Sequence, residues 1–100
     1  MYNIIFVDDE QRVLDGLKRM LYKRRNEWNM VFAISGEEAL SRMNDISFDL
    51  VVSDMRMPKM DGAELLSHVK ERNPSIIRVV LSGQMDQITA LQALSVSHQF

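Results

Sequence analysis

Acidic residues follow two apolar segments of the chain at positions where carboxylates can do chemistry. Asp8 and Asp9 come directly after one apolar run, residues 4–7, and Asp54 closes another, residues 49–54. Carboxylates that lie close together repel one another until a proton or a cation neutralises them. Mg²⁺ takes one or two carboxylates and fills its other octahedral positions with water and phosphate oxygens. The acids therefore predict an oxygen-rich site for Mg²⁺, with Mn²⁺ as an alternative.

A carboxylate in such a site can also act as a nucleophile toward phosphorus and form an acyl phosphate. Phosphoryl transfer depends mainly on positioning and on neutralising charge around the transferred group. Asp54 precedes a loop that contains Pro58, and the hydroxyl of Ser82 follows a fourth apolar run. Metal-binding acids, an exposed carboxylate and a hydroxyl donor meet most needs of this chemistry. The component that the pattern lacks is a protein cation.

The elements that must bring these residues together alternate between apolar strands and amphipathic helices. Strands are expected at residues 4–7, 30–34, 49–54 and 76–81, and helices at 11–25, 36–43, 61–73 and 85–94. This alternation predicts right-handed crossovers and a parallel sheet with helices on both faces. The carboxyl ends of parallel strands share one edge, so Asp8, Asp9, Asp54 and Ser82 are expected to meet there.

Local signals mark the starts of two helices. Ser35 and Glu38 form a capping-box pattern, in which the hydroxyl accepts from the Glu38 amide and the carboxylate reaches back. Asp61 and Glu64 can cap the third helix. Trp28 is expected to pack beside the second strand.

Composition limits the class of protein. The 100 residues suffice for one domain, and 46% of them are hydrophobic, which is typical of a globular chain. A net charge of -2 argues against direct nucleic-acid binding, and the absence of cysteine excludes disulfides and thiolate metal sites. No basic leader and no apolar run of the ~20 residues that a membrane span requires is found. A soluble cytoplasmic protein is the expectation.

Three segments carry a resemblance to a known family. Residues 7–10 (VDDE), 54–62 (DMRMPKMDG) and 81–83 (LSG) resemble, in order and spacing, the receiver domains of two-component response regulators. The resemblance covers the whole chain. It implies a flavodoxin-like, doubly wound parallel sheet with strand order 2-1-3-4. It also implies a signalling domain that catalyses its own phosphorylation and dephosphorylation and is not otherwise an enzyme.

The resemblance assigns roles to individual residues. Asp54 would accept a phosphoryl group from a sensor histidine kinase or a phosphotransfer protein, and the switch would control an output domain on the full-length chain. Asp9 and Asp54 would bind Mg²⁺ directly, together with the backbone carbonyl of Arg56. The other implied roles are water-mediated metal contact for Asp8, hydroxyl donation to the phosphoryl oxygens for Ser82, and the switch aromatic for Phe100.

The end of the chain departs from the family pattern. The family's lysine is expected about three residues after Phe100, and the usual Gly-Ala pair is replaced by Val96 and Ser97. Residues 1–100 are therefore interpreted as a receiver domain that is incomplete at its C-terminus. If the native chain were this short, the unpaired edge of the fourth strand would favour a homodimer.

Several alternatives stay open at this stage. The acids after the first strand can serve only the dipole of the first helix, and Ser82 with Gly83 can be a simple turn. Met55, Met57 and Met60 are interpreted as packing residues, because thioethers suit soft metals. A basic stripe is interpreted as a solvated face, with the edge of a kinase-docking surface as the alternative. The stripe consists of Lys18, Arg19, Lys23, Arg24 and Arg25.

Two other functions compete with the receiver interpretation. An aspartyl phosphohydrolase usually carries its nucleophile in a D-x-D arrangement, which Asp8, Asp9 and Glu10 lack. A receiver-like interaction module that works without phosphorylation is the second alternative. Arg56, two residues after Asp54, is expected to modulate the lifetime of any phosphoryl group.

Overall fold

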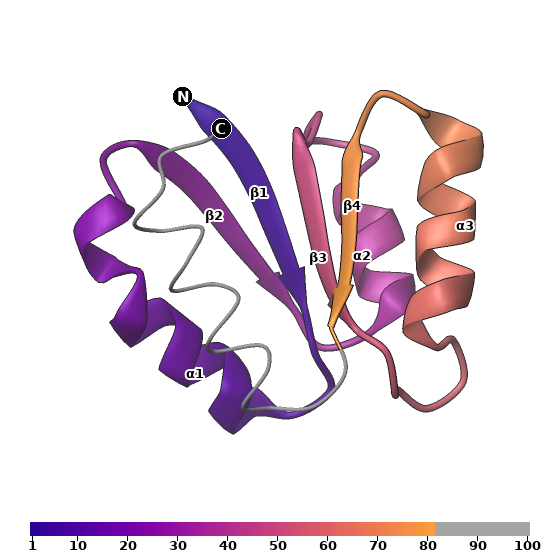
Figure 1. The fold of residues 1–100 in the computed structure, drawn as a ribbon, viewed down its shortest axis with the longest axis horizontal. Coiled ribbons are helices and arrows are strands. Elements are labelled where there is room, and N and C mark those ends of the chain that lie inside the picture. Colours follow the sequence, from indigo (N-terminus) through magenta and orange to yellow (C-terminus); the bar gives the residue numbers. More distant parts are fainter. Residues whose placement is uncertain (82–100) are drawn as a thin grey trace.

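The structure is a computed structural model, and it describes residues 1–81 of the chain. Figure 1 shows the path of these residues through the fold. The elements in chain order are β1 (Tyr2–Val7), α1 (Gln11–Met20), the 3-10 helix η1 (Tyr22–Arg24), β2 (Trp28–Ala33), α2 (Gly36–Arg42), β3 (Leu50–Asp54), α3 (Gly62–Arg72) and β4 (Ile77–Leu81). The helix expected at 85–94 lies outside the described residues.

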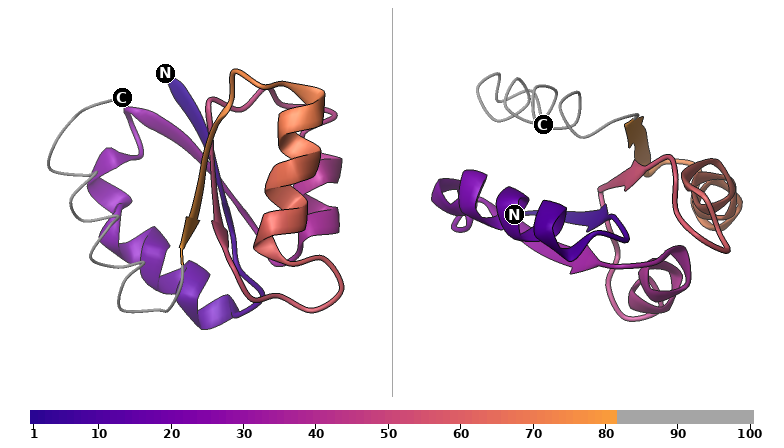
Figure 2. Two further views of the ribbon diagram at one scale, coloured as in Figure 1. Left: turned by 45° about the vertical axis from the view of Figure 1, so that its right-hand side comes forward. Right: turned by 90° about the horizontal axis from the view of Figure 1, so that it is seen from below.

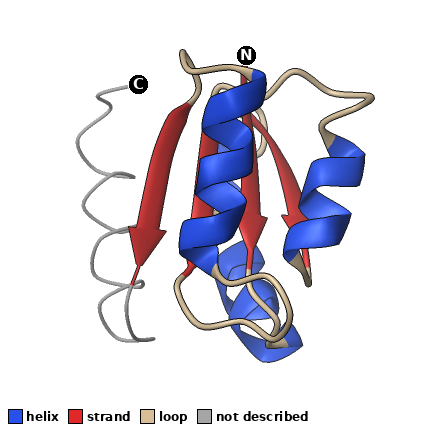
Figure 3. Ribbon diagram, turned by 90° about the vertical axis from the view of Figure 1, so that its right-hand side faces the viewer, coloured by secondary structure: helices blue, strands red, loops and turns tan. Residues whose placement is uncertain are grey.

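The four strands form one parallel sheet in the order β2-β1-β3-β4. Strand β1 is central, with Val7 in register with Ala33 on one side and with Ser53 on the other. Strand β4 pairs with β3, where Asp54 is in register with Leu81. Figure 3 shows the strands side by side, with all arrowheads at the same edge. The flavodoxin-like order expected from the sequence is confirmed.

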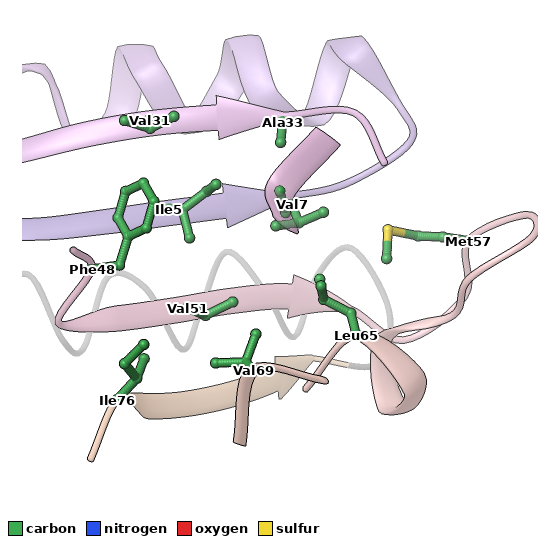
Figure 4. Close-up of a cluster of buried hydrophobic side chains, with 11 residues drawn as sticks. Ile5, Val7, Val31, Ala33, Phe48, Val51, Met57, Leu65, Val69 and Ile76 are labelled. Carbon is green, nitrogen blue, oxygen red and sulfur yellow. The ribbon is translucent and has the colours of Figure 1, made fainter. Parts of the chain in front are cut away.

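Each face of the sheet buries its own hydrophobic cluster, because successive side chains of a strand point to opposite faces. Helices α2 and α3 cover one face and α1 covers the other (Figure 2). The α2–α3 cluster, shown in Figure 4, contains Ile5, Val7, Val31, Ala33, Ala39, Phe48, Val51, Met57, Leu65, Val69 and Ile76. The α1 cluster contains Ile4, Phe6, Val13, Leu14, Leu17, Leu21, Trp28, Leu50 and Val52. Strands buried on both faces explain the continuous apolar runs in the sequence.

The first helix is shorter than expected. It ends at Met20, and a 3-10 turn takes the place of the residues up to 25. After Leu21, which is buried, the next four residues are Tyr22 followed by three cations, so a continued helix would have no apolar face to bury. Strand β2 also begins two residues before the expected position, because Trp28 is itself a buried strand residue.

The cap of α2 differs from the expected pattern in one hydrogen bond. The Ser35 hydroxyl accepts from the Glu38 amide at 3.0 Å, as predicted. The Glu38 carboxylate, however, accepts from the Ile34 amide at 2.7 Å, one residue before the helix cap itself. The bond therefore fixes the exit from β2 as well as the start of α2.

Strand β4 is the outermost strand on its side among the described residues. Ile77 and Val80 on it are 55% and 38% exposed. A homodimer through this edge stays a prediction. Within residues 1–81, no helix has both the length and the apolar character needed to cross a membrane.

Candidate phosphoacceptor and metal site

Asp8 lies at the carboxyl end of β1 and is held firmly by the backbone around it. Its amide donates to the Ala33 carbonyl of β2 at 3.1 Å, and its Oδ1 accepts from the Glu10 amide at 2.9 Å. The side chain is only 4% exposed, whereas the next residue, Asp9, is exposed. The Asp8 contact turns the chain from the strand toward α1. The acidic pair thus offers one buried and one open carboxylate.

Asp54 closes β3, beside the end of β1, and is partly buried. One carboxylate oxygen from each of Asp8, Asp9 and Asp54 lies within 4.8 Å of the other two. This separation suits three ligands grouped around one cation. The structure thus brings the three acids together at the edge where the sequence placed them.

The surroundings of Asp54 in this cluster change its pKa. Burial raises the pKa of Asp54 above its ordinary value of 3.8, and the charges of Asp8 and Asp9 raise the pKa further. The hydrogen bond from the Met55 backbone acts in the opposite direction, and the charge of Glu10 adds a smaller increase. A nearby positive charge would oppose these effects and favour the ionised form of Asp54.

Gly62 holds the loop after Asp54 against the strand, a role that the sequence did not reveal. Its amide donates to the Met55 carbonyl at 2.9 Å, and a Cβ placed on it would collide with the backbone oxygen of Asp54. The same Cβ would lie 3.0 Å from the Met55 Cα and from a methyl group of Val80. Only glycine allows the start of α3 to approach the end of β3 this closely. The glycine in the 54–62 pattern was a signal, but its reason depends on tertiary distances.

The loop between β3 and α3 contains an unusual backbone turn. Lys59 has a φ of 68°, in the left-handed region, and the Met60 amide donates to the Pro58 carbonyl at 2.8 Å. These two features describe a tight γ-turn centred on Lys59. Met57 is buried in the α2–α3 cluster and Met60 packs against that cluster, so the packing interpretation is confirmed for both.

The remaining predicted site residues lie in different situations. Arg56 is exposed in the loop directly after Asp54 and Met55. Ser82 and Phe100 lie outside the described residues. In the basic stripe, Arg24 forms an ion pair with Glu27 at 2.9 Å.

Comparison with known proteins decides the family. A family model described as the response regulator receiver domain matches residues 4–99. The chain belongs to this family. The match explains why carboxylates gather at the carboxyl ends of β1 and β3 in this receiver domain.

Curated relatives are longer proteins. The hydrogenase transcriptional regulatory protein HoxA of Cupriavidus necator is 36% identical over 83% of this chain and 17% of its own length. The transcriptional regulatory protein ZraR of Salmonella typhimurium is 35% identical over 92% of this chain and 20% of its own length. The receiver domain thus spans about a fifth of these relatives.

A solved structure supports the same placement. The signal receiver domain of an HD domain-containing protein from Pseudomonas fluorescens superimposes with a TM-score of 0.77 at 29% identity. The alignment covers 93% of this chain and 73% of the other. The sheet order described above is therefore shared with a receiver domain of known structure.

Proposed function

We propose that this receiver domain accepts a phosphoryl group on Asp54 from a phosphohistidine of a sensor kinase or phosphotransfer protein. The observation that carries the proposal is the group of three carboxylates, each with one oxygen within 4.8 Å of the other two. The side chain of Asp54 in this group is only partly buried. An Asp54 carboxylate oxygen forms a bond to phosphorus while the bond between phosphorus and the donor imidazole nitrogen breaks. Asp54 is thus the nucleophile, and the buried Asp8 and the Gly62 contact hold its surroundings in place.

The donor set fits a hard divalent cation. All three grouped side chains offer carboxylate oxygens, which Mg²⁺ and Mn²⁺ prefer. Burial, followed by the charges of Asp8 and Asp9, raises the pKa of Asp54. Asp9, Asp54 and the backbone carbonyl of Arg56 would hold the cation, with Asp8 acting through water because its Oδ1 already accepts from the Glu10 amide. When bound, the cation would neutralise charge on the carboxylates and on the incoming phosphoryl oxygens.

The other assigned residues complete the proposal. Ser82 would donate its hydroxyl to the phosphoryl oxygens, and Phe100 would follow that movement as the switch aromatic. Arg56, exposed beside the acceptor, would alter the rate at which water removes the phosphoryl group. Since the relatives are named as transcriptional regulatory proteins, we infer that this domain controls an output domain of a longer protein in the cytoplasm.

Labelling with a small phosphodonor tests the nucleophile. With Mg²⁺ and acetyl phosphate, the protein is expected to gain the mass of one phosphoryl group, which hydroxylamine removes as it does from acyl phosphates. Asp54→Asn should abolish the label, and Asp45→Asn, at an exposed acid outside the cluster, should keep it. Label that persists on Asp54→Asn contradicts the assignment. A folded wild-type protein that takes no label favours a phosphorylation-independent interaction module, and continuous turnover of the donor favours a phosphohydrolase.

A further inference from the structure

A groove runs along the outer side of β2, two strands away from Asp54. Its open volume is about 290 Å³. It lies between α1, η1 and the edge strand, and it has cationic walls and an apolar floor. The main residues that line it are Lys18, Tyr22, Arg25, Trp28, Met30 and Phe32.

Cations in and beside the groove are held over aromatic rings. The Lys18 ammonium lies 5.1 Å from the centre of the Phe32 ring, and the Arg25 guanidinium lies 3.8 Å from the centre of the Tyr22 ring. These contacts favour positions of the two cations over the rings and do not neutralise their charge. Anions that enter the groove therefore meet positive charge on its walls.

The surrounding sequence makes this region basic on an otherwise acidic chain. Residues 18–25 contain five of the 12 Lys and Arg side chains, although the net charge of the chain is -2. The one acid between residues 18 and 30 is Glu27, which forms an ion pair with Arg24 at 2.9 Å. The remaining positive charge favours an acidic partner by electrostatic complementarity.

The backbone of β2 offers hydrogen bonds on the same side. Among residues 1–81, β2 pairs only with β1, and the Ala33 carbonyl accepts from the Asp8 amide of that side. Backbone groups of successive strand residues point in alternate directions within the sheet plane. The N–H and C=O groups of Met30 and Phe32 therefore point away from β1, toward the open edge.

We propose that this groove binds an acidic peptide segment of a partner protein, extended alongside β2. Main-chain hydrogen bonds to Met30 and Phe32 would supply affinity, as in other cases where a peptide adds a strand to a sheet edge. Glutamate or aspartate side chains on the α1 side of the peptide would pair with Lys18 and Arg25, and an apolar side chain on that same side would lie against Trp28. The surface is separate from the carboxylate cluster and does not depend on phosphorylation of Asp54.

Binding is measured with a fluorescent peptide of about seven residues, which spans β2 at roughly 3.3 Å per residue. The peptide has glutamate at positions 2 and 6, phenylalanine at position 4 and valine at the other positions, so that the acidic and aromatic side chains face the same side of the strand. Anisotropy is expected to give a Kd of roughly 10–100 μM that rises with salt. Trp28, the only tryptophan of the chain, should change its fluorescence, and the amide NMR signals of Met30 and Phe32 should shift.

Charge-reversal variants test the electrostatic part. Lys18→Glu and Arg25→Glu are each expected to weaken binding about tenfold, as loss of a charge-assisted contact does. Lys70→Glu, at an exposed lysine on α3, carries the same change of charge and should bind as the wild type. Equal weakening by all three variants would show a general charge effect and overturn the proposal.

Peptide variants test strand pairing without altering the protein. Methylation of the backbone nitrogens on alternate residues, made in both possible registers, should abolish binding in one register and spare it in the other. Equal binding of both methylated peptides, or of an unstructured oligoglutamate, overturns the β2-edge model. No binding below about 1 mM, or shifts that map to another face, also overturns it. Tighter binding to anionic lipid vesicles than to the peptide would assign the basic groove to a membrane surface instead.

Discussion

Asp54 must satisfy two requirements that oppose each other. In the proposed reaction it has to be ionised to attack phosphorus, yet burial and the charges of Asp8 and Asp9 raise its pKa and favour the protonated form. A cation between the carboxylates removes this conflict, because it stabilises all the ionised forms at once. Asp8 and Asp9, which disfavour the ionised form of Asp54, therefore also favour binding of a divalent ion at the same place.

The raised pKa predicts that Asp54 opposes folding in the absence of metal. The folded chain binds the Asp54 proton more tightly than the unfolded chain does, so ionised Asp54 lowers the free energy of unfolding. This destabilisation is largest at pH values above the folded pKa and disappears as the pH falls toward 3.8. In EDTA at neutral pH, Asp54→Asn should raise the melting temperature, with a gain below ~1 kcal/mol because the group is partly exposed.

Calorimetry as a function of pH checks the sign of this effect. The difference between Asp54→Asn and the wild type should shrink on acidification, although both proteins lose stability from their other carboxylates. Saturating Mg²⁺ should favour the wild type, by about 1.4 kcal/mol at tenfold excess over Kd. A variant that is less stable than the wild type in EDTA at neutral pH would contradict the electrostatic account.

The two neighbouring acids are expected to differ in their effect on metal affinity. Asp9→Ala should weaken Mg²⁺ binding about tenfold or more, and Asp8→Ala less, because Asp8 is buried and already bonded to the Glu10 amide. Amide NMR shifts near Met55 measure the affinity. Trp28 lies at the opposite end of β2 from the cluster and is therefore a poor reporter of metal binding. Equal losses in both variants would contradict the ranking.

At the scale of elements, the β3–α3 connection is held by several close backbone contacts beside Asp54. It leaves β3 at Asp54, passes through the turn at Lys59, and enters α3 at the Asp61 cap, whose Oδ1 accepts from the Glu64 amide at 2.8 Å. The Met55 amide donates to the Leu81 carbonyl at 3.0 Å, so the connection is also tied to β4. This hydrogen bond therefore joins the loop to the end of β4 beside Asp54.

Gly62 is expected to be intolerant of even one added carbon. Gly62→Ala should cost roughly 1–3 kcal/mol in the free energy of unfolding, because backbone atoms of Asp54 and Met55 would have to move. It should also slow labelling of Asp54. Gly16→Ala is the matched control, since a Cβ there meets only the end of the Arg19 side chain at 3.9 Å. Gly16→Ala should raise the free energy of unfolding by about 0.5–1 kcal/mol, because alanine is favoured over glycine inside a helix. Equal effects of the two substitutions would contradict the steric argument.

Lys59 offers a test of backbone strain in the same loop. Its φ of 68° favours glycine, so Lys59→Gly should preserve or raise stability by up to about 1 kcal/mol. Lys59→Val should lower stability by about 1–2 kcal/mol, because β-branched residues adopt this conformation least well. Chemical denaturation measures both. A valine variant as stable as the glycine variant would show that the turn is not held in this conformation in solution.

At the scale of the whole molecule, the sequence predicts the sheet and the edge at which its acidic residues meet. Apolar runs that end in Asp8 and Asp54 mark strands whose carboxyl ends meet, and parallel-sheet geometry supplies the rest. The sequence predicted that Trp28 packs beside the second strand, but not that β2 begins there or that α1 ends at Met20. Both bounds depend on which side chains the α1 face of the sheet buries. The sequence also did not predict the close contact of Gly62 with β3 or the hydrogen bond between Glu38 and Ile34. Each depends on a distance between two elements.

The central position of β1 in the sheet has a consequence for folding during synthesis on the ribosome. β1 emerges first, but its partners, β2 and β3, begin only at Trp28 and Leu50. The apolar β1 therefore has no neighbouring strand until β2 is available, and its second neighbour becomes available only with β3. Chaperones that hold extended apolar segments would meet β1 in this interval. A pause in translation that keeps β2 or β3 inside the ribosome after β1 has left it would lengthen that exposure.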